Sequence, residues 1–257
     1  MFLEKFELKN YCSIVTGAAQ GLGKYMALAL AEAGSNIVIP DVNFELAKES
    51  AREIEKKGVK TLAIKMDVRN KNEIDKMVNV VLNNFGNIDV LINNAGISKH
   101  INIETMDYKD WLEVIDINLN GVFLVSQAVG NVMIKQRKGS IINISSMSGI
   151  IVNIPQNQAA YNVSKAAVIM LTKSLAGEWA KHNVRVNTIA PGYMNIGVAE
   201  EFFEKETDMA KKWLSMTPMA RPGEPEELGG IAIYLASEAS SFATGGVFPV
   251  DGGYTVW

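Results

Sequence analysis

Tyr161 and Lys165 are the residues whose types and spacing are best suited to proton transfer. They stand four positions apart in the stretch 160–167, which is rich in good helix formers, and positions i and i+4 share one face of a helix. A free tyrosine has a pKa of about 10. A neighbouring ammonium favours the phenolate and lowers that pKa, so the pair could act as a general acid and base near neutral pH. Short motifs also arise by chance, and the alternative is two unrelated residues on a surface helix.

A glycine-rich turn near the N-terminus is typical of a phosphate cradle. An apolar run at 11–15 precedes Thr16-Gly17-Ala18-Ala19-Gln20-Gly21-Leu22-Gly23, and a helical pattern follows. We expect Gly17 to permit a tight turn, Gly21 to let the backbone approach a pyrophosphate, and Gly23 to allow close packing of helix on strand. Amide groups at a helix start attract phosphates. The spacing differs from the commoner Gly-x-Gly-x-x-Gly, and a flexible loop remains the alternative.

Asp41 ends the second predicted strand, where a carboxylate can accept hydrogen bonds from both hydroxyls of an adenosine ribose. It would repel a 2′-phosphate, and Gln20, Val42 and Asn43 bring no compensating positive charge. Lys24 is a nearby cation, but it lies inside the following helix. The sequence therefore predicts NAD(H) rather than NADP(H). The alternative is that Asp41 only caps the helix that begins near Asn43.

Strand and helix patterns alternate along the chain with short connections. They predict a single α/β domain, residues 1–257, with a parallel, doubly wound sheet and helices on both faces. The predicted strands are 11–15, 36–40, 60–66, 88–92, 140–145, 184–189 and 247–250, and the predicted helices are 24–33, 44–57, 70–85, 107–137, 166–179 and one that starts at 225. Segment 194–219 is predicted to be a lid, with one or two short amphipathic helices at 200–216.

Composition narrows the class of protein. The chain has 257 residues, is 48% hydrophobic and carries a net charge of −3, which predicts a globular core and gives no indication of a nucleic-acid partner. Cys12 is the single cysteine and there are two histidines, so neither a disulfide framework nor a thiolate or histidine-rich metal site is expected. We identify no signal segment, lipidation motif or membrane span. The expectation is a soluble, cytoplasmic protein.

Two helical stretches are apolar nearly all round: 119–129, which is the core of 107–137, and 166–179. A helix on the outer face of a sheet normally has one polar side. We therefore expect a partner subunit to cover both helices across a symmetric interface. The alternative is that they stack within one chain.

Taken together and in order, the motifs resemble those of the short-chain dehydrogenase/reductase family, and the match is collinear over nearly the whole chain. The residues that carry the resemblance are Thr16-Gly17-x-x-x-Gly21-x-Gly23, Asp67, Asn93-Asn94-Ala95-Gly96, Asn118, Ser146, Tyr161-x-x-x-Lys165 and Pro191-Gly192. The resemblance implies a Rossmann-like sheet with strand order 3-2-1-4-5-6-7, a nicotinamide dinucleotide cofactor and a homotetramer.

The same resemblance assigns catalytic roles. Tyr161 would exchange a proton with the substrate oxygen, and Lys165 would lower its pKa and bind the nicotinamide ribose. Ser146 would hold the substrate oxygen, and it is preferred over Ser145 because it falls at the family position after the strand. Asn118 would position a water that links Lys165 to solvent.

The resemblance also implies cofactor contacts. Asp67 and Val68 would contact the adenine, and Asn94 the adenosine side. Ile196 stands where the family often has a threonine that binds the carboxamide, so backbone at Met194 and Ile196, or Asn195, would take its place. The expected cofactor set is Gly17, Gln20, Gly21, Leu22, Gly23, Asp41, Asp67, Val68, Asn94, Ala95, Gly96, Tyr161, Lys165, Pro191, Gly192, Met194 and Ile196.

The stretches 146–155 and 251–257 look most like family members that act on polyols and ketoses, of the sorbitol-, galactitol- and threitol-dehydrogenase kind. The expected substrate contacts are Ser146, Ser148, Asn153 and Tyr161, with His100 as a further hydroxyl partner. Asn153 could instead make a turn, and His100 could be solvated. Trp257 would pack against a neighbouring subunit, and a structural Mg²⁺ near the C-terminus is possible, with no catalytic metal.

Two alternative functions stay open. One is a 3-oxoacyl-thioester or small-ketone reductase, which the acidic lid disfavours because an acidic acyl carrier would prefer a basic surface; the lid acids are Glu200, Glu201, Glu204 and Glu206. The other is a non-catalytic dinucleotide sensor, which would be expected to lose catalytic groups, whereas all four are present here.

Overall fold

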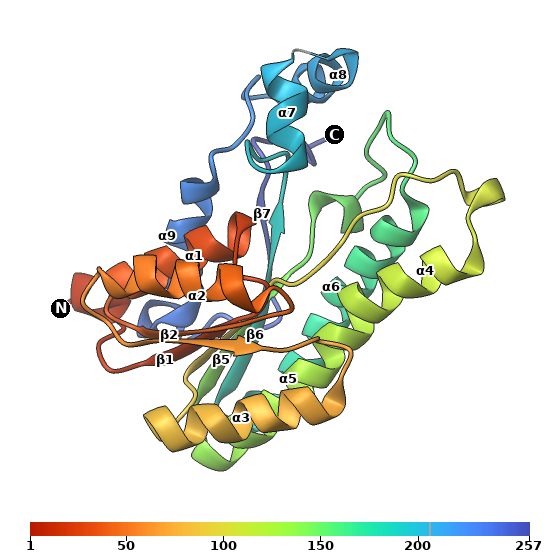
Figure 1. The fold of residues 1–257 in the computed structure, drawn as a ribbon. Coiled ribbons are helices and arrows are strands. Elements are labelled where there is room, and N and C mark those ends of the chain that lie inside the picture. The colour runs from red at the N-terminus through yellow and green to blue at the C-terminus, as the bar shows by residue number, and fades with distance from the viewer. Residues whose placement is uncertain (206) are drawn as a thin grey trace.

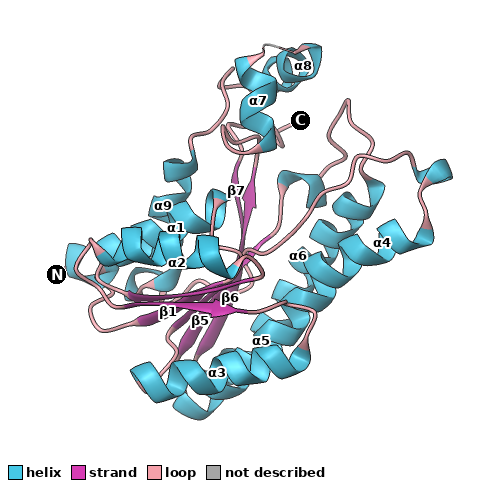
Figure 2. Cartoon of the chain, viewed as in Figure 1, coloured by secondary structure: helices cyan, strands magenta, loops and turns pink. Residues whose placement is uncertain are grey.

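The computed structural model describes residues 1–205 and 207–257. At its centre is a parallel sheet of seven strands in the order β3-β2-β1-β4-β5-β6-β7, which confirms the predicted fold and strand order (Figures 1 and 2). The strands are β1 (Cys12–Val15), β2 (Asn36–Asp41), β3 (Thr61–Lys65), β4 (Val90–Asn93), β5 (Gly139–Ile144), β6 (Val184–Pro191) and β7 (Val247–Val250). Because all seven run the same way, their carboxyl ends meet at one edge, and the order reverses between β1 and β4.

Helices cover both faces of this sheet (Figure 1). One face carries α1 (Gly21–Glu32), α2 (Phe44–Glu55) and α9 (Gly229–Ala236). The other carries α3 (Lys71–Phe85), α5 (Gly121–Gln136) and α6 (Ala159–Trp179), with α4 (Tyr108–Ile115) beside α6. The short helices α7 (Val198–Glu204) and α8 (Asp208–Met216) extend beyond the carboxyl edge of the sheet, in the segment predicted to be a lid.

The apolar strands are explained by their place between two helical layers. Every residue of β1, β4 and β5 is buried, whereas the edge strands β3 and β7 are mostly half-buried. Buried parallel strands read as continuous apolar runs rather than as alternating patterns. One core cluster lies under α1, α2 and α9, and the second lies under α3, α5 and α6.

A buried polar ladder fixes the sheet to the helices that reach the site. Asn93 on β4 pairs in register with Asn143 on β5, and its Nδ2 donates to Asn143 Oδ1 at 2.8 Å and to Ser126 Oγ of α5 at 2.8 Å. Asn143 Nδ2 in turn donates to Thr172 Oγ1 of α6 at 2.9 Å. Buried polar groups that are fully paired specify one arrangement of their elements. The ladder therefore sets the position of α5 and α6 relative to the strands.

The region predicted as one helix over 107–137 is divided in the structure. A π-helical turn, Asp116–Asn120, separates α4 from α5, and the Gly121 amide donates to the Asp116 carbonyl. Single π-turns inside helices occur often at functional sites. This one carries Asn118. Helix α6 begins at Ala159, so Tyr161 lies in its first turn and the helix expected over 160–167 is present.

By length and composition alone, the continuous helical stretch 108–136 could cross a membrane, which the sequence analysis did not anticipate. Val122, Val125 and Val129 of this stretch are buried, and Val125 and Val129 belong to the core cluster that contains residues of the strands. Core packing therefore accounts for the apolar character of that side of α5.

Candidate active site

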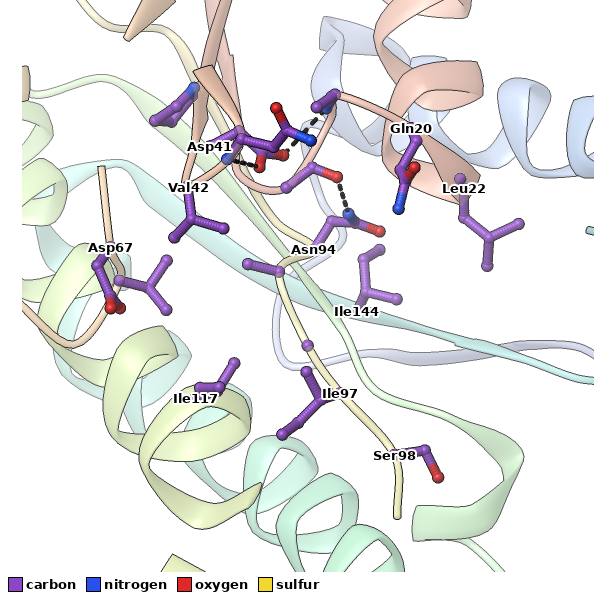
Figure 3. Close-up of a pocket in the computed structure, with 18 of the residues that line it drawn as sticks. Gln20, Leu22, Asp41, Val42, Asp67, Asn94, Ile97, Ser98, Ile117 and Ile144 are labelled. Atoms are coloured by element: carbon purple, nitrogen blue, oxygen red, sulfur yellow. Dashed lines mark hydrogen bonds between the residues drawn. The ribbon is translucent and has the colours of Figure 1, made fainter. Parts of the chain in front are cut away.

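A cleft of about 670 Å³ opens at the carboxyl edge of the sheet, where the strand order reverses. In parallel α/β sheets this is the usual place for a ligand. Turns after β1, β2, β3, β4, β5 and β6 line the cleft, together with Tyr161 and Lys165 of α6. Figure 3 shows part of this wall, from Gln20 after β1 to Ile144 at the end of β5. The predicted residues found in its wall are Gly17, Gln20, Gly21, Leu22, Asp41, Asp67, Val68, Asn94, Ala95, Gly96, Ser146, Tyr161, Lys165, Pro191 and Gly192.

The glycine turn is built as the sequence predicted. Gly17 has φ +66°, and a Cβ there would lie 2.9 Å from the Ala95 Cα, so a larger residue would force the turn away from β4. A Cβ on Gly23 would lie 2.4 Å from Asn94 Nδ2. That amide donates to the carbonyls of Thr16 and Gly17 at 3.0 and 3.1 Å (Figure 3). Gly23 thus lies behind the cleft wall, where it makes room for the amide that holds the turn.

The first turn of α1 fits a phosphate group. Gln20 stands at the N-cap without a side-chain capping bond, and Gly21 follows it with φ +65°. The first amides of a helix have no partner within the helix and carry partial positive charge. A glycine at this point keeps side-chain atoms out of the approach to them. These residues therefore fit the pyrophosphate of a dinucleotide.

Asp41 faces the cleft and is held by backbone amides (Figure 3). Its Oδ2 accepts from the Ala19 amide at 3.1 Å and its Oδ1 from the Asn43 amide at 2.9 Å. The alternative that Asp41 caps α2 is wrong, because Asn43 does so by accepting from the Leu46 amide at 3.2 Å. Lys24, the nearby cation, forms an ion pair elsewhere, with Glu53 at 2.6 Å.

Arg69 is a cleft residue that the sequence analysis missed. It lines the cleft beside Asp67 and Val68. Its guanidinium donates hydrogen bonds to both carboxylate oxygens of Asp67, with an Nη2–Oδ2 distance of 2.6 Å. These hydrogen bonds hold the pKa of the Asp67 carboxyl below its usual value. The signal in the sequence was a basic side chain two positions after a strand-ending aspartate. Apolar and small lining residues were also missed: Ile97, Ser98, Ile117 and Ile144.

Ser146, rather than Ser145, faces Tyr161. Ser146 Oγ accepts from the Ser148 amide at 3.1 Å and hydrogen bonds with the Tyr161 phenol. Ser145 Oγ points away and donates to the Ile189 carbonyl at 3.0 Å. The preference for Ser146 stated from the sequence therefore agrees with the geometry, although its catalytic role remains a prediction.

Lys165 lies close to Tyr161 but hydrogen bonds elsewhere. It is only 4% exposed, its Nζ donates to the Ile144 carbonyl at 2.8 Å, and it lies 5.5 Å from the centroid of the Tyr161 ring. Burial lowers the pKa of Lys165 to about 8. Burial also raises the pKa of Tyr161, against a smaller lowering by the hydrogen bond with Ser146. The pKa of Tyr161 is thus raised in this structure, whereas the sequence predicted that it would be lowered. That prediction considered the charge of Lys165 and not the desolvation of the phenol.

Asn118 is fully buried beneath this pair. Its Nδ2 donates to the Ile97 carbonyl at 2.9 Å and to Ser164 Oγ at 3.1 Å, and its Oδ1 accepts from the Ile97 amide at 2.8 Å. A Cβ on Gly96 would lie 3.2 Å from Asn118 Oδ1 and 3.5 Å from Lys165 Nζ. The two polar groups therefore converge beside Gly96.

Met194 and Ile196 lie outside the cleft wall, and the backbone donors expected to hold a carboxamide are used within the chain. The Ile196 amide donates to the Met194 carbonyl at 2.9 Å, and the Asn195 amide donates to the Gly223 carbonyl at 2.7 Å. The Ile196 side chain packs against the core under α1 and α9. Asn195 Nδ2 is within 3.4 Å of Glu224.

Ser148 and Asn153 also lie behind the cleft rather than in its wall. They are 5% and 2% exposed, and Gln158 Nε2 donates to Ser148 Oγ and to Asn153 Oδ1, each at 3.1 Å. His100 is exposed on the loop after β4 and does not line the cleft. In this structure Ser148 and Asn153 hydrogen bond within the protein, and the substrate contacts expected of them and of His100 stay predictions.

In the C-terminal segment, Asp251 makes hydrogen bonds within the chain. Asp251 accepts from the Gly253 and Thr255 amides at 3.0 Å and from Thr255 Oγ1 at 2.6 Å. Across residues 1–205 and 207–257, no cluster of three or more His, Cys, Asp or Glu side chains could hold an ion. Trp257 is 77% exposed, and its Nε1 lies 3.4 Å from the Met216 carbonyl. Of the lid acids, Glu206 lies outside the described residues, and Glu200, Glu201 and Glu204 are exposed.

Comparisons with known proteins identify the family of this chain. A family model described as enoyl-(acyl carrier protein) reductase matches residues 17–255. Sorbose reductase SOU1 of Candida albicans is 43% identical over 98% of this chain and 90% of its own length, and galactitol 2-dehydrogenase of Rhizobium johnstonii is 40% identical over 100% and 99%. The crystal structure of gox2181 superposes with a TM-score of 0.97 at 41% identity, covering 100% of both chains.

Other relatives differ in the substrate and cofactor that their names state. The 3-oxoacyl-[acyl-carrier-protein] reductase FabG of Thermotoga maritima is 40% identical over 97% of this chain and 99% of its own. A xylitol dehydrogenase structure with NAD⁺ has a TM-score of 0.90, and a gluconate 5-dehydrogenase of Burkholderia cenocepacia with NADP and tartrate has one of 0.93. Fold, site and relatives together place this chain in the short-chain dehydrogenase/reductase family.

Proposed function

We propose that this protein is an NAD(H)-dependent dehydrogenase that interconverts a secondary alcohol of a polyol and the ketone of a ketose. Oxidation and reduction between secondary alcohols and ketones is the coarser activity that its sorbose reductase and galactitol dehydrogenase relatives support. One observation carries the proposal: Ser146, Tyr161 and Lys165 meet on the wall of a dinucleotide-sized cleft that begins at the first turn of α1.

The roles of the side chains follow from this geometry. A bound nicotinamide would accept or supply the hydride. Ser146 holds the substrate oxygen, and Tyr161 takes its proton during oxidation and returns it during reduction. Because burial raises the pKa of Tyr161, the ammonium of Lys165 is needed nearby to favour the phenolate. Asn118 would hold a water beside Lys165, where the two groups converge.

The carboxylate of Asp41 supports NAD(H) over NADP(H). It faces the adenosine end of the cleft, and Lys24 is engaged by Glu53. A 2′-phosphate placed there would meet a like charge, which is costly. Arg69 is a cation in the cleft wall, but both oxygens of Asp67 hold its guanidinium. The residues named for cofactor binding stay proposals, and so does the chemistry assigned to each.

A 3-oxoacyl-thioester reductase is the second candidate, because FabG of Thermotoga maritima is as similar to this chain as the galactitol dehydrogenase is. The exposed acidic side chains Glu200, Glu201 and Glu204 on α7 argue against an acidic carrier protein as partner.

We also propose that residues 1–257 act as one catalytic domain with 194–219 as its lid, that the protein is a cytoplasmic homotetramer, and that it binds neither nucleic acid nor membrane.

The test is a panel of polyols, ketoses and 3-oxoacyl thioesters with NAD(H) and NADP(H), read by absorbance of the reduced nicotinamide. We expect turnover of a polyol–ketose pair with NAD(H). Preferred turnover of the thioester would replace the proposal with the second candidate, and a protein that binds NADH but turns over none of these compounds would favour a sensor.

Tyr161→Phe should abolish turnover, by about 10³-fold or more, and leave NADH affinity unchanged, because the ring still fills its place while the proton carrier is lost. NADH binding is measured by fluorescence titration. Wild-type rates in the variant would refute the role of Tyr161 as acid and base.

A further inference from the structure

A buried chain of hydrogen bonds runs from the lid to the catalytic helix without passing through the cleft wall. It links α8, the loop between β5 and α6, the end of β6 and the start of α6. The side chains of this chain, which we call the lid network, are Trp213, Gln156, Tyr193, Asn153, Gln158 and Ser148. None of them lines the cleft, and all except Tyr193 are at least nine-tenths buried.

At its lid end the network holds α8 by two contacts. Trp213 Nε1 donates to Gln156 Oε1 at 2.9 Å. The indole also stacks on the Tyr193 ring, with centroids 4.2 Å apart and planes 16° apart. Gln156 Nε2 donates to the Tyr193 hydroxyl at 2.9 Å. The indole N–H and the ring face of Trp213 therefore contact two members of one hydrogen-bonded unit.

The Tyr193 hydroxyl is the centre of the network. It accepts from Gln156 and, at 2.8 Å, from Asn153 Nδ2, and it hydrogen bonds with Tyr254. Tyr193 directly follows Gly192, which lines the cleft. A shift of the lid would thus act on the loop after β5 through Asn153 and on the cleft edge through the backbone of β6.

At its catalytic end the network is linked to Ser146 through Ser148, and it includes the residue three positions before Tyr161 on α6. Gln158 Nε2 lies 3.1 Å from Asn153 Oδ1, 3.1 Å from Ser148 Oγ and 3.0 Å from Asn162 Oδ1. Gln158 is the N-cap position of α6, three residues before Tyr161. Ser148 is connected to Ser146 through its own amide, which donates to Ser146 Oγ at 3.1 Å.

We propose that the lid network couples the seating of α8 to the spacing of Ser146 and Tyr161, and that Trp213, Gln156, Gln158 and Asn153 are positioning residues. In this assignment the Asn153 amide orients the loop and does not bind a substrate hydroxyl. Rows of paired buried groups act as a unit, and removing one member leaves its partner unsatisfied. The inference rests on the proposed function, since the coupling matters only if these two side chains hold a reacting oxygen.

The first test is Trp213→Phe, which removes the indole N–H and keeps an aromatic ring for the stack. Using the alcohol that the substrate panel identifies, we expect kcat to fall about tenfold with little change in KM, because the lost interaction positions the reacting groups rather than the substrate. NADH affinity should stay unchanged, since no network residue lines the cleft. Lys212→Ala, an exposed change on the same helix, is the matched control and should leave kcat unchanged.

The second test is a double-mutant cycle between the two ends of the network, Trp213→Phe and Ser148→Ala. No hydrogen bond or ring contact joins these two residues directly among those that define the network. If the network acts as a unit, the double variant should lose no more activity than the more severe single variant. If the losses of kcat in the two single variants multiply in the double variant, the proposal is overturned. It is also overturned if Trp213→Phe lowers the melting temperature and leaves kcat unchanged.

Gln156→Met replaces Trp213→Phe if that variant does not fold. It removes the acceptor for the indole and the donor to Tyr193 within a side chain of similar length. The same loss of kcat with unchanged NADH affinity is expected, and unchanged kcat would overturn the proposal. A wild-type protein that oxidises no alcohol defeats the proposed function instead, which separates the two failures.

Discussion

At the scale of single residues, desolvation decides the acid–base properties of the site. Lys165 and Tyr161 are one helical turn apart, yet burial moves both pKa values toward the neutral forms of the side chains. A cation near a phenol favours the phenolate only while the cation itself is charged. With a Lys165 pKa of about 8, that condition holds below pH 8 and weakens above it.

Lys165 should leave a signature in the pH dependence of stability. Its pKa is about 8 in the folded protein against 10.5 for the free side chain, so the unfolded chain binds more protons between these values and stability rises with pH across that window. The gain between pH 7 and 9.5 is about 2 kcal/mol. Denaturant unfolding of wild type and of Lys165→Met checks this: the variant should lack the rise, and parallel curves for the two proteins would contradict it.

Asp41 should control the choice of cofactor. Asp41→Ala removes the charge that faces the adenosine end of the cleft, and Asp41→Arg reverses it. We expect the ratio of kcat/KM for NADP(H) over NAD(H) to rise about tenfold or more in each, with the larger rise in the arginine variant, because a like-charge contact becomes neutral or attractive. Steady-state kinetics with both cofactors give this ratio. An unchanged ratio would contradict a contact between Asp41 and the adenosine ribose.

Gly17, Asp41 and Tyr161 could be placed in the cleft wall because each has a chemical reason for its type, whereas Asp67, Asn94 and Ser146 were expected from the family resemblance. Arg69 and Ile117 escaped prediction, since nothing in their own chemistry requires a cofactor. The direction of the Tyr161 pKa also escaped, because burial depends on packing that a local pattern does not contain.

At the scale of elements, the glycine turn depends on how closely α1 approaches the end of β4. Gly23→Ala would place a Cβ 2.4 Å from Asn94 Nδ2 and displace the amide that holds the Thr16 and Gly17 carbonyls. We expect a loss of about 1–3 kcal/mol in the free energy of unfolding. NADH affinity should fall about tenfold as the turn shifts.

Gly230→Ala is the matched control for this substitution. A Cβ there meets nothing within 4 Å, and Gly230 is exposed on α9. Alanine in an open helical position stabilises by roughly 0.5–1 kcal/mol over glycine. Thermal melts and NADH titrations of both variants test the pair, and equal effects of the two changes would show that the close approach at Gly23 is unimportant.

Most element boundaries could be predicted from apolar runs and turn residues, as at Asn70, which caps α3, and Gly86, which ends it. The division of 107–137 could not, because the π-turn at Asp116–Asn120 interrupts hydrogen bonds without changing the composition. That irregularity positions Asn118, a side chain of the proposed catalytic set.

At the scale of the whole molecule, the sheet order was expected from the family resemblance and not from the strand patterns, which allow many orders. Helices α5 and α6 were predicted to be apolar nearly all round, and the structure gives two different reasons for their apolar residues. Val125 and Val168 are buried in the chain itself, whereas Phe123, Val163 and Met170 are 42%, 48% and 61% exposed. The exposed set is what supports a partner subunit.

Phe123→Asp should therefore lower the oligomeric state. A charge on an apolar interface must be desolvated on association, so we expect a shift from tetramer toward dimer or monomer in light scattering. Leu3→Asp is the control, because Leu3 is an 84% exposed apolar residue in the N-terminal turn, away from α5 and α6. A monomeric wild-type protein would end the proposal of a tetramer.

Helix α6 carries the phenol and the ammonium near its start and leaves Val163 and Met170 bare along its length. Because Val163 is two positions from Tyr161, a displacement of α6 from its outer side would also move the Tyr161 phenol. In the proposed tetramer a partner subunit therefore packs directly behind the proton carrier, and dissociation of the subunits would remove that support.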